Sequence, residues 1–235
     1  MRLNFANQRI LAVLAHPDDE FLCAGTLARA KADGAMVALY VLCRGDRGQP
    51  NPPIANLAEV RRTEMNAAAG LLGAELFCGE FGDGELFDSA QSRAILIQQY
   101  RQFRPSLVLA HAASDYHADH RAASALAEAA SWFSASPGHH TASPPLDMPP
   151  ALWWLDTVGM HDFSPHFYID TSDHVDLKRQ IIRCHRSQIA RGGEPGFPPL
   201  EELIVRQAET RGAQSEVRAA EAFRLHHAWK RMRAW

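Results

Sequence analysis

The sequence predicts a single α/β domain with a Rossmann-like, three-layer α/β/α architecture and a mostly parallel sheet. Three observations support this prediction. Short apolar runs that suit buried strands alternate with longer amphipathic stretches that suit helices, which is typical of a parallel sheet with helical crossovers. The 235 residues can bury one sizeable core, and an apolar fraction of 46% is that of a globular protein. The chain also has no internal repeat that would divide it.

The first half of the chain opens with a β-α-β pattern. Residues 9–15 form a continuous apolar run, residues 21–33 carry apolar side chains at helical spacing, and residues 36–43 are apolar again. Glycines and prolines exclude regular structure from residues 44–56, so we expect a long loop there. The later elements of this half are expected as a helix over 57–72, a strand over 75–78, a turn over 81–85, a helix over 89–103 and a strand over 107–110.

The second half begins with a polar segment. Residues 134–150 are rich in proline, serine, glycine and histidine, which suits either a mobile flap or an ordered surface excursion. Beyond it we expect strands over 151–157 and 167–170, helices over 175–189 and 200–211, and a short strand or turn over 221–225. The last residues, 225–235, mix basic and aromatic side chains, which favours a docked amphipathic tail over an oligomer contact.

Composition and charge restrict the classes of function. A net charge of −3 gives no general reason to bind nucleic acid or an anionic membrane surface. No apolar run approaches the roughly 20 residues that cross a bilayer, and residues 1–8 lack the build of a signal peptide. Cys23, Cys43, Cys78 and Cys184 are far apart, and we expect them to be buried free thiols. These features predict a cytoplasmic protein that acts on a small polar molecule.

Two polar motifs follow predicted strands. The segment H-P-D-D-E, residues 16–20, comes directly after the first strand, and H-A-D-H, residues 117–120, follows a later one. Both should lie at the carboxyl edge of the sheet, where ligands bind in open parallel sheets. His16, Asp19 and His120 would supply two nitrogen ligands and one oxygen ligand and leave a position for water, which is typical of catalytic zinc. Iron(II) suits the same ligand set.

Structural alternatives exist for each of these residues. Acidic side chains at positions 18 to 20 could stabilise a helix N-terminus through its dipole, and His117 and His120 could be surface histidines. The pairing of two motifs favours the metal site for Asp18 and Asp19, whereas it leaves the role of Glu20 open. No second metal site is expected at the remaining histidines considered, because none has a carboxylate or second histidine at ligand spacing: His111, His139, His140, His161 and His166.

The two motifs together resemble those of the LmbE/PIG-L family of zinc-dependent N-acetylglucosaminide de-N-acetylases. The resemblance extends to about residue 190. Further segments similar to family features are Arg61 and Glu64 in the second helix, F-G-D-G at 81–84, Lys178, and H-R-S-Q at 185–188. The resemblance implies removal of an N-acetyl group from an amino sugar, with release of acetate and a free amine, and it implies a homo-oligomer.

The family pattern also implies roles for the motif residues. His16, Asp19 and His120 would bind zinc, and Asp18 would be the general base that takes a proton from the metal-activated water. Protonated His117 would stabilise the tetrahedral oxyanion, and Asp119 would orient that imidazole or stabilise its charge.

Three arginines are candidates for substrate binding. Arg44 and Arg47 lie in the predicted loop and could bind hydroxyl, phosphate or carboxylate groups, or they could be solvated. Arg61 could contact the substrate or form a structural ion pair with Glu64, which is better suited to a structural role.

Two other functions remain open from the sequence. The chain could hydrolyse another small N-acyl amide, such as a natural-product or antibiotic intermediate. It could also be a non-catalytic metal-binding or sugar-binding protein, but such a protein needs no base like Asp18 beside an open metal position.

Overall fold

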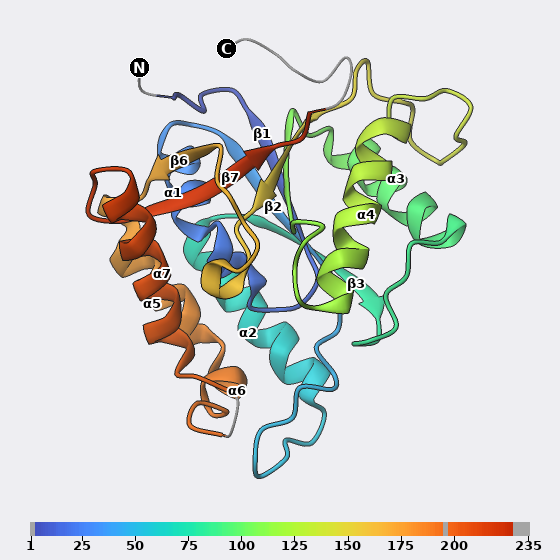
Figure 1. The fold of residues 1–235 in the computed structure, drawn as a ribbon. Coiled ribbons are helices and arrows are strands. Elements are labelled where there is room, and N and C mark those ends of the chain that lie inside the picture. The colour runs from blue at the N-terminus through green and yellow to red at the C-terminus, as the bar shows by residue number, and fades with distance from the viewer. Residues whose placement is uncertain (1–2, 195–196, 228–235) are drawn as a thin grey trace.

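The computed structural model describes residues 3–194 and 197–227. A seven-stranded sheet with the order β3-β2-β1-β4-β5-β7-β6 runs through its centre (Figure 1). The strands are β1 (Arg9–Leu14), β2 (Met36–Cys43), β3 (Glu75–Phe81), β4 (Leu107–Ala110), β5 (Ala151–Leu155), β6 (Phe167–Asp170) and β7 (Ala220–Leu225). The first five strands pair in parallel, and β7 is antiparallel to both of its neighbours. The mostly parallel sheet expected from the sequence is confirmed.

Helices cover both faces of this sheet. They are α1 (Ala24–Ala32), α2 (Leu57–Leu72), α3 (Ala90–Phe103), α4 (Ala118–Phe133), α5 (Val175–Cys184), α6 (Arg186–Ile189) and α7 (Leu200–Gln214). Figure 1 shows α3 and α4 on one face and α1, α2, α5 and α7 on the other. This is the expected three-layer α/β/α arrangement. No helix of the described residues is both long and apolar enough to cross a membrane.

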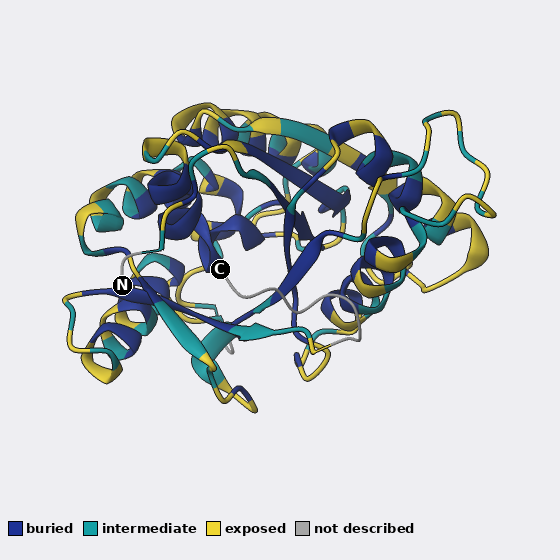
Figure 2. Ribbon diagram, turned by 90° about the horizontal axis from the view of Figure 1, so that it is seen from above, coloured by how far each residue is buried: buried dark blue, intermediate teal, exposed yellow. Residues whose placement is uncertain are grey.

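The central strands carry continuous apolar runs because helices cover both faces of the sheet. Along β1, Ile10 and Ala12 pack into the core on the α1 side, whereas Leu11 and Val13 pack into the core on the α4 side. Strands buried on both faces lose the apolar and polar alternation of a half-exposed strand. Figure 2 shows the buried residues concentrated on the central strands.

The carboxyl ends of β1 and β4 meet in the middle of the sheet. The chain leaves β1 toward β2 on one side, and β4 pairs with β1 on the other side. Connections that run in opposite directions from adjacent strands open a crevice, and this is where open α/β sheets bind ligands. Both sequence motifs follow these two strands.

The expected helix over 175–189 is interrupted. α5 ends at Cys184, and α6 begins at Arg186. At the break, the carboxylate of Glu64 accepts hydrogen bonds from the backbone N (2.8 Å) and the Oγ (2.6 Å) of Ser187. A side chain of another helix therefore satisfies a backbone N–H that a continuous helix would bond internally.

Other boundaries also differ from expectation. The helix expected over 21–33 is a 3-10 turn, η1 (Asp19–Leu22), followed by α1. Of the two alternatives for residues 221–225, a short strand or a turn, the structure shows the strand, which begins one residue earlier at Ala220. Residues 134–150 form an irregular surface excursion, and the guanidinium of Arg101 donates to the carbonyls of Ser134 (3.0 Å) and Ser136 (2.7 Å) within it. The last residues, 228–235, lie outside the described part.

The prediction of four buried thiols is wrong for two of them. Cys23 and Cys43 are buried, but Cys78 is exposed and Cys184 is half-buried. Cys78 lies in β3, which is at the edge of the sheet, so the apolar run around it has cover on fewer sides. All four cysteines are free, as expected.

Candidate metal centre and active site

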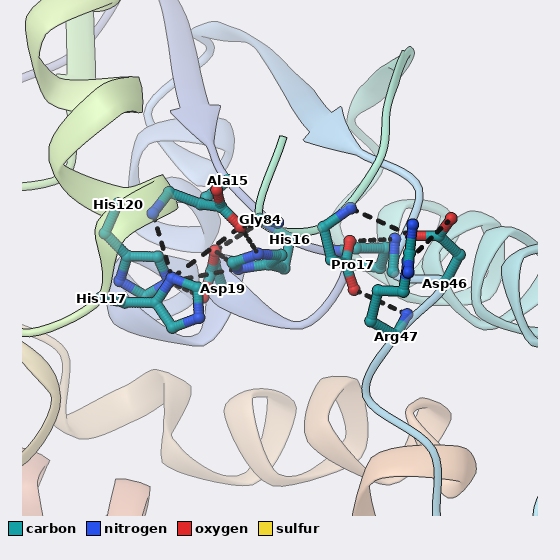
Figure 3. A network of polar contacts seen from close by, with 12 residues as sticks. Ala15, His16, Pro17, Asp19, Asp46, Arg47, Gly84, His117 and His120 are labelled. Carbon is teal, nitrogen blue, oxygen red and sulfur yellow. Dashed lines mark hydrogen bonds and ion pairs between the residues drawn. The ribbon is translucent and has the colours of Figure 1, made fainter. Parts of the chain in front are cut away.

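The strand ends and one helix start bring the two motifs together. The chain turns after β1 through residues 16–18 and enters η1, so Asp19 already belongs to a helical turn. After β4, His117 caps the start of α4, where its Nδ1 accepts a hydrogen bond from the backbone N of Asp119 at 3.2 Å. Figure 3 shows His16, Asp19, His117 and His120 facing one another.

The three predicted metal ligands lie close together. Nδ1 of His16 lies 3.3 Å from Nε2 of His120, which lies 3.3 Å from Oδ1 of Asp19. The distance from Nδ1 of His16 to Oδ2 of Asp19 is 3.6 Å. Atoms bound tetrahedrally to zinc at its usual bond lengths lie roughly 3.4 Å apart. The two nitrogens and the Asp19 carboxylate are therefore close enough for one metal ion, although the two Asp19 distances involve different oxygens. Among the described residues, three groups have ligand atoms that all lie within 4.8 Å of one another: His16, His117 and His120; His16, Cys43 and Asp119; and Asp19, His111 and His120.

Carboxylates support both imidazoles from behind. The second ring nitrogen of His16 lies 2.9 Å from Oδ2 of Asp119, and that of His120 lies 3.1 Å from Oδ1 of Asp115. Metal-bound histidines usually donate their other N–H to such a partner, which fixes the ring and its tautomer. Asp119 was expected beside His117, but it is 3.9 Å from that ring and closer to His16. Asp115 was not considered from the sequence, although its position two residues before His117 could have indicated it.

These carboxylates stabilise positive charge in the site. Burial alone would lower the pKa of His16, but hydrogen bonds to Asp119 and Asp19 outweigh it and raise the pKa to about 9. Burial likewise opposes a charged His120, but Asp19 and Asp115 raise its pKa to about 10. Burial would raise the pKa of Asp19, yet His120 and His111 hold it well below its ordinary value. A divalent cation would replace the protons that this site favours.

Asp18 lies beside the metal ligands in a different environment. Burial raises the pKa of its carboxyl to about 6, against the opposing charge of Arg61. Its side chain is 15% exposed and faces the same cavity as His16 and Asp19. A carboxylate whose pKa lies near neutrality is well suited to accept a proton at physiological pH.

His117 does not favour the protonated form that was expected. Burial, together with the neighbouring imidazoles of His16 and His120, lowers its pKa. Its Nδ1 accepts a hydrogen bond from the backbone of Asp119, so the proton of the neutral ring lies on Nε2. The neutral imidazole therefore still has one N–H to donate.

His111 is a site residue that the sequence interpretation dismissed. The ring is fully buried and stacks on His120, with 4.0 Å between the centroids. Its Nε2 lies 3.2 Å from Oδ2 of Asp19 and accepts a hydrogen bond from the backbone N of Ala15. The expectation that His111 lacks a neighbouring carboxylate or histidine is wrong, because its partners come from another strand end and another helix.

The three predicted substrate-binding arginines lie in different surroundings. Arg47 lines the cavity, is largely exposed, and lies 3.0 Å from Glu85. Arg44 pairs with Asp46 at 3.0 Å. Arg61 is buried, donates to the carbonyl of Pro17, and lies 3.1 Å from Oδ1 of Asp18. Its expected ion pair with Glu64 does not form, because the carboxylate of Glu64 binds Ser187 instead.

A cavity of about 590 Å³ opens above these residues. That volume is in the range of small-molecule sites, which is roughly 300–1,000 Å³. Beyond the motif residues, its polar lining includes Arg47, Arg61, Asp83, Gln188 and Arg191. Its apolar and aromatic lining is formed by Phe21, Tyr116, Val158, Phe197, Pro198, Leu200 and Leu203.

Residues 11–131 match the family model described as PIG-L, GlcNAc-PI de-N-acetylase. The match covers more than half of the chain and includes both motifs. The chain belongs to the PIG-L family. The two motifs from which a metal site was inferred therefore lie within the part of the chain that matches a de-N-acetylase family.

Relatives of this PIG-L family member include enzymes of two kinds. Diacetylchitobiose deacetylase of Thermococcus kodakarensis is 28% identical over 77% of this chain and 70% of the relative. The structure of N,N′-diacetylchitobiose deacetylase from Pyrococcus horikoshii superposes with a TM-score of 0.82 at 26% identity, over 93% of this chain and 84% of that one. The 4-oxalmesaconate hydratase of Pseudomonas putida is 26% identical over 91% of this chain and 83% of the relative.

Proposed function

We propose that this PIG-L family member is a metal-dependent hydrolase that removes the N-acetyl group from an N-acetylglucosamine-type amino sugar or its conjugate, with zinc as the metal. One observation carries the proposal: His16, Asp19 and His120 converge in a cavity that Asp18 and His117 also line. Metal ligands beside a carboxylate base are what hydrolysis of an amide by water requires. The relatives named as deacetylases support this reaction.

Asp18 and His117 have different roles in the proposed reaction. When bound, the cation polarises the acetamide carbonyl and lowers the pKa of a water molecule. Asp18 accepts the proton that the water loses as its oxygen attacks the carbonyl carbon. His117 donates its Nε2–H to the carbonyl oxygen as that oxygen becomes negative. Asp18 then returns the proton to the amine nitrogen, and the C–N bond breaks to give acetate and the free amine.

The direct test is release of acetate from N-acetylglucosamine and its β-linked dimer by the purified protein. We expect release to stop when the metal is chelated and to resume when zinc is added back. Asp18→Asn should lose the activity, whereas Glu80→Gln, a change at an exposed carboxylate of β3, should keep it. Activity that survives both chelation and Asp18→Asn would contradict the proposal.

The same assay separates the other functions. Release of an acyl group from non-sugar amides only would favour a small-amide hydrolase. Addition of water to 4-oxalmesaconate without acetate release would favour the reaction of the hydratase relative. Metal and amino-sugar binding without turnover would favour a binding protein. Metal analysis of the purified protein distinguishes zinc from iron, and the solution mass tests the homo-oligomer, which stays a prediction.

A further inference from the structure

The backbone of Asp18 is in a conformation that side chains rarely adopt. Its φ is 112° and its ψ is −22°. For a residue other than glycine, such a conformation is strained and persists only where the surroundings hold it. The position of Asp18, the proposed base, therefore depends on the residues that contact it.

The guanidinium of Arg61 contacts Asp18 on both sides of its α-carbon. Nη2 donates to the carbonyl of Pro17, which belongs to the peptide before Asp18, and the same atom lies 3.1 Å from Oδ1 of the Asp18 side chain. Nη2 carries two hydrogens, so it can serve both acceptors. One rigid group from α2 thus sets the orientation of the peptide plane and of the carboxylate together.

Arg61 lines the cavity, but its side chain has little freedom to move. The residue is 3% exposed. Gly45 packs against its stem: a Cβ at that position would lie 2.8 Å from Cδ and from Nη1 of Arg61. The loop after β2 therefore closes over the arginine and leaves its guanidinium directed at Asp18.

A second anchor lies just beyond Asp18. Nε2 of His185 lies 2.5 Å from Oε1 of Glu20, and both side chains are fully or almost fully buried. Burial would lower the pKa of His185, but the charge of Glu20 outweighs it and raises that pKa. The break between α5 and α6 brings His185 to this place. Glu20, whose role the sequence left open, fixes the turn on the side of Asp18 opposite to Pro17.

We propose that Arg61, which lines the cavity, is a positioning residue that acts with the Glu20–His185 pair to hold Asp18 in its left-handed conformation. Asp18 can then present its carboxylate to the cavity in one orientation. The inference rests on the proposed function, because it assigns a task to the surroundings of the proposed base.

The main experiment compares Arg61→Lys with Arg62→Met, a change at the adjacent, exposed arginine of α2. A lysine keeps the charge but cannot reproduce the planar two-acceptor contact. We expect Arg61→Lys to lower kcat by roughly 10- to 100-fold, the loss expected of a misplaced catalytic group, with KM and the Kd of glucosamine within about twofold. Arg62→Met should match the parent protein. A raised KM with unchanged kcat, or an unchanged kcat, would overturn the inference.

A double-variant cycle provides a readout that a general loss of stability would not give. If Arg61 acts through Asp18, adding Arg61→Lys to the Asp18→Asn variant should not lower kcat any further. Full additivity of the two losses would overturn the inference. A crystal structure of the Arg61→Lys protein should show a changed φ at Asp18, and an unchanged Asp18 would also overturn it.

Failure of the two proposals can be told apart. A parent protein that releases no acetate contradicts the proposed function. An active parent protein with an unaffected Arg61→Lys variant contradicts the positioning role alone.

Discussion

Two of the buried charge clusters in the described chain are built differently. In the C-terminal half, Lys178 lies 2.8 Å from Glu221, and Arg211 lies 2.7 Å from Asp156. Each carboxylate there has a permanently charged partner and also accepts backbone hydrogen bonds, from Gly25 and Thr26 or from Thr157. These ion pairs need no ligand to neutralise the charge of their carboxylates.

In the cluster at the strand ends, most carboxylates have no lysine or arginine partner among the described residues. Its four carboxylates belong to Asp18, Asp19, Asp115 and Asp119. Arg61 contacts the first of them, and histidines contact the other three. Removal of one partner from a buried ion pair destabilises a fold, because the other charge is left uncompensated. Buried carboxylates that contact imidazoles are instead suited to binding a metal ion and to moving protons. Four predictions test this contrast.

The largest effect is expected for Asp18→Asn. The amide keeps the size of the side chain but cannot accept a proton, so kcat should fall by about 10²–10⁴-fold. Zinc content should change little, because Asp18 is not one of the proposed metal ligands. Acetate release and metal analysis measure both. A protein that loses its zinc with this change would place Asp18 among the ligands instead.

The matching change in the C-terminal half is Lys178→Met. It leaves the buried carboxylate of Glu221 without its cation, which should lower the free energy of unfolding by about 3–5 kcal/mol. Urea titration measures this loss. Zinc affinity of the folded protein should be unchanged, and a large loss of zinc affinity would show that the two clusters are coupled.

A smaller effect is expected for Asp115→Asn. The carboxylate orients the ring of His120 without touching the metal position, and loss of such a partner usually weakens metal binding by about 10- to 100-fold. Competition with a chromophoric chelator measures the Kd of zinc. Asp147→Asn, at an exposed carboxylate, is the control. Equal zinc affinity in both variants would remove Asp115 from the metal centre.

The smallest effect is expected from pH. Asp18 works as a base only when ionised, and burial raises its pKa to about 6, so the rate should fall as the pH falls below this value, by up to about tenfold per unit. A bound cation lowers the pKa of a neighbouring carboxyl, so the midpoint should lie at or below pH 6. A profile of kcat with excess zinc tests this, and a midpoint above pH 7 would exclude Asp18 as the base.

Local sequence was sufficient for much of the fold. The apolar runs of β1, β2 and β4 and the amphipathic stretches between them follow from spacing along the chain. The same reasoning located H-P-D-D-E and H-A-D-H at strand ends and hence at one edge of the sheet. The convergence of His16, Asp19 and His120 in the structure agrees with that reasoning.

Side-chain partners across long distances could not be predicted in the same way. Glu20 and His185 are separated by 165 positions, and their contact depends on a break that Glu64 stabilises between two helices. His111 was dismissed because its partners do not lie near it in sequence. Arg61 was left between a substrate contact and an ion pair with Glu64, because nothing local shows that Gly45 packs over it.

The sequence by itself therefore determined the α/β class, the edge of the sheet that carries the site and the residue types able to bind a metal. These depend on periodicity and on residues a few positions apart, which the chain encodes locally. The tertiary structure alone decided which nitrogen of each histidine faces the others, which carboxylate supports which ring, and what holds Asp18. Those features depend on the packing of α2, α4, α5 and α6 against the strand ends, where contacts of a few ångströms join residues far apart in sequence.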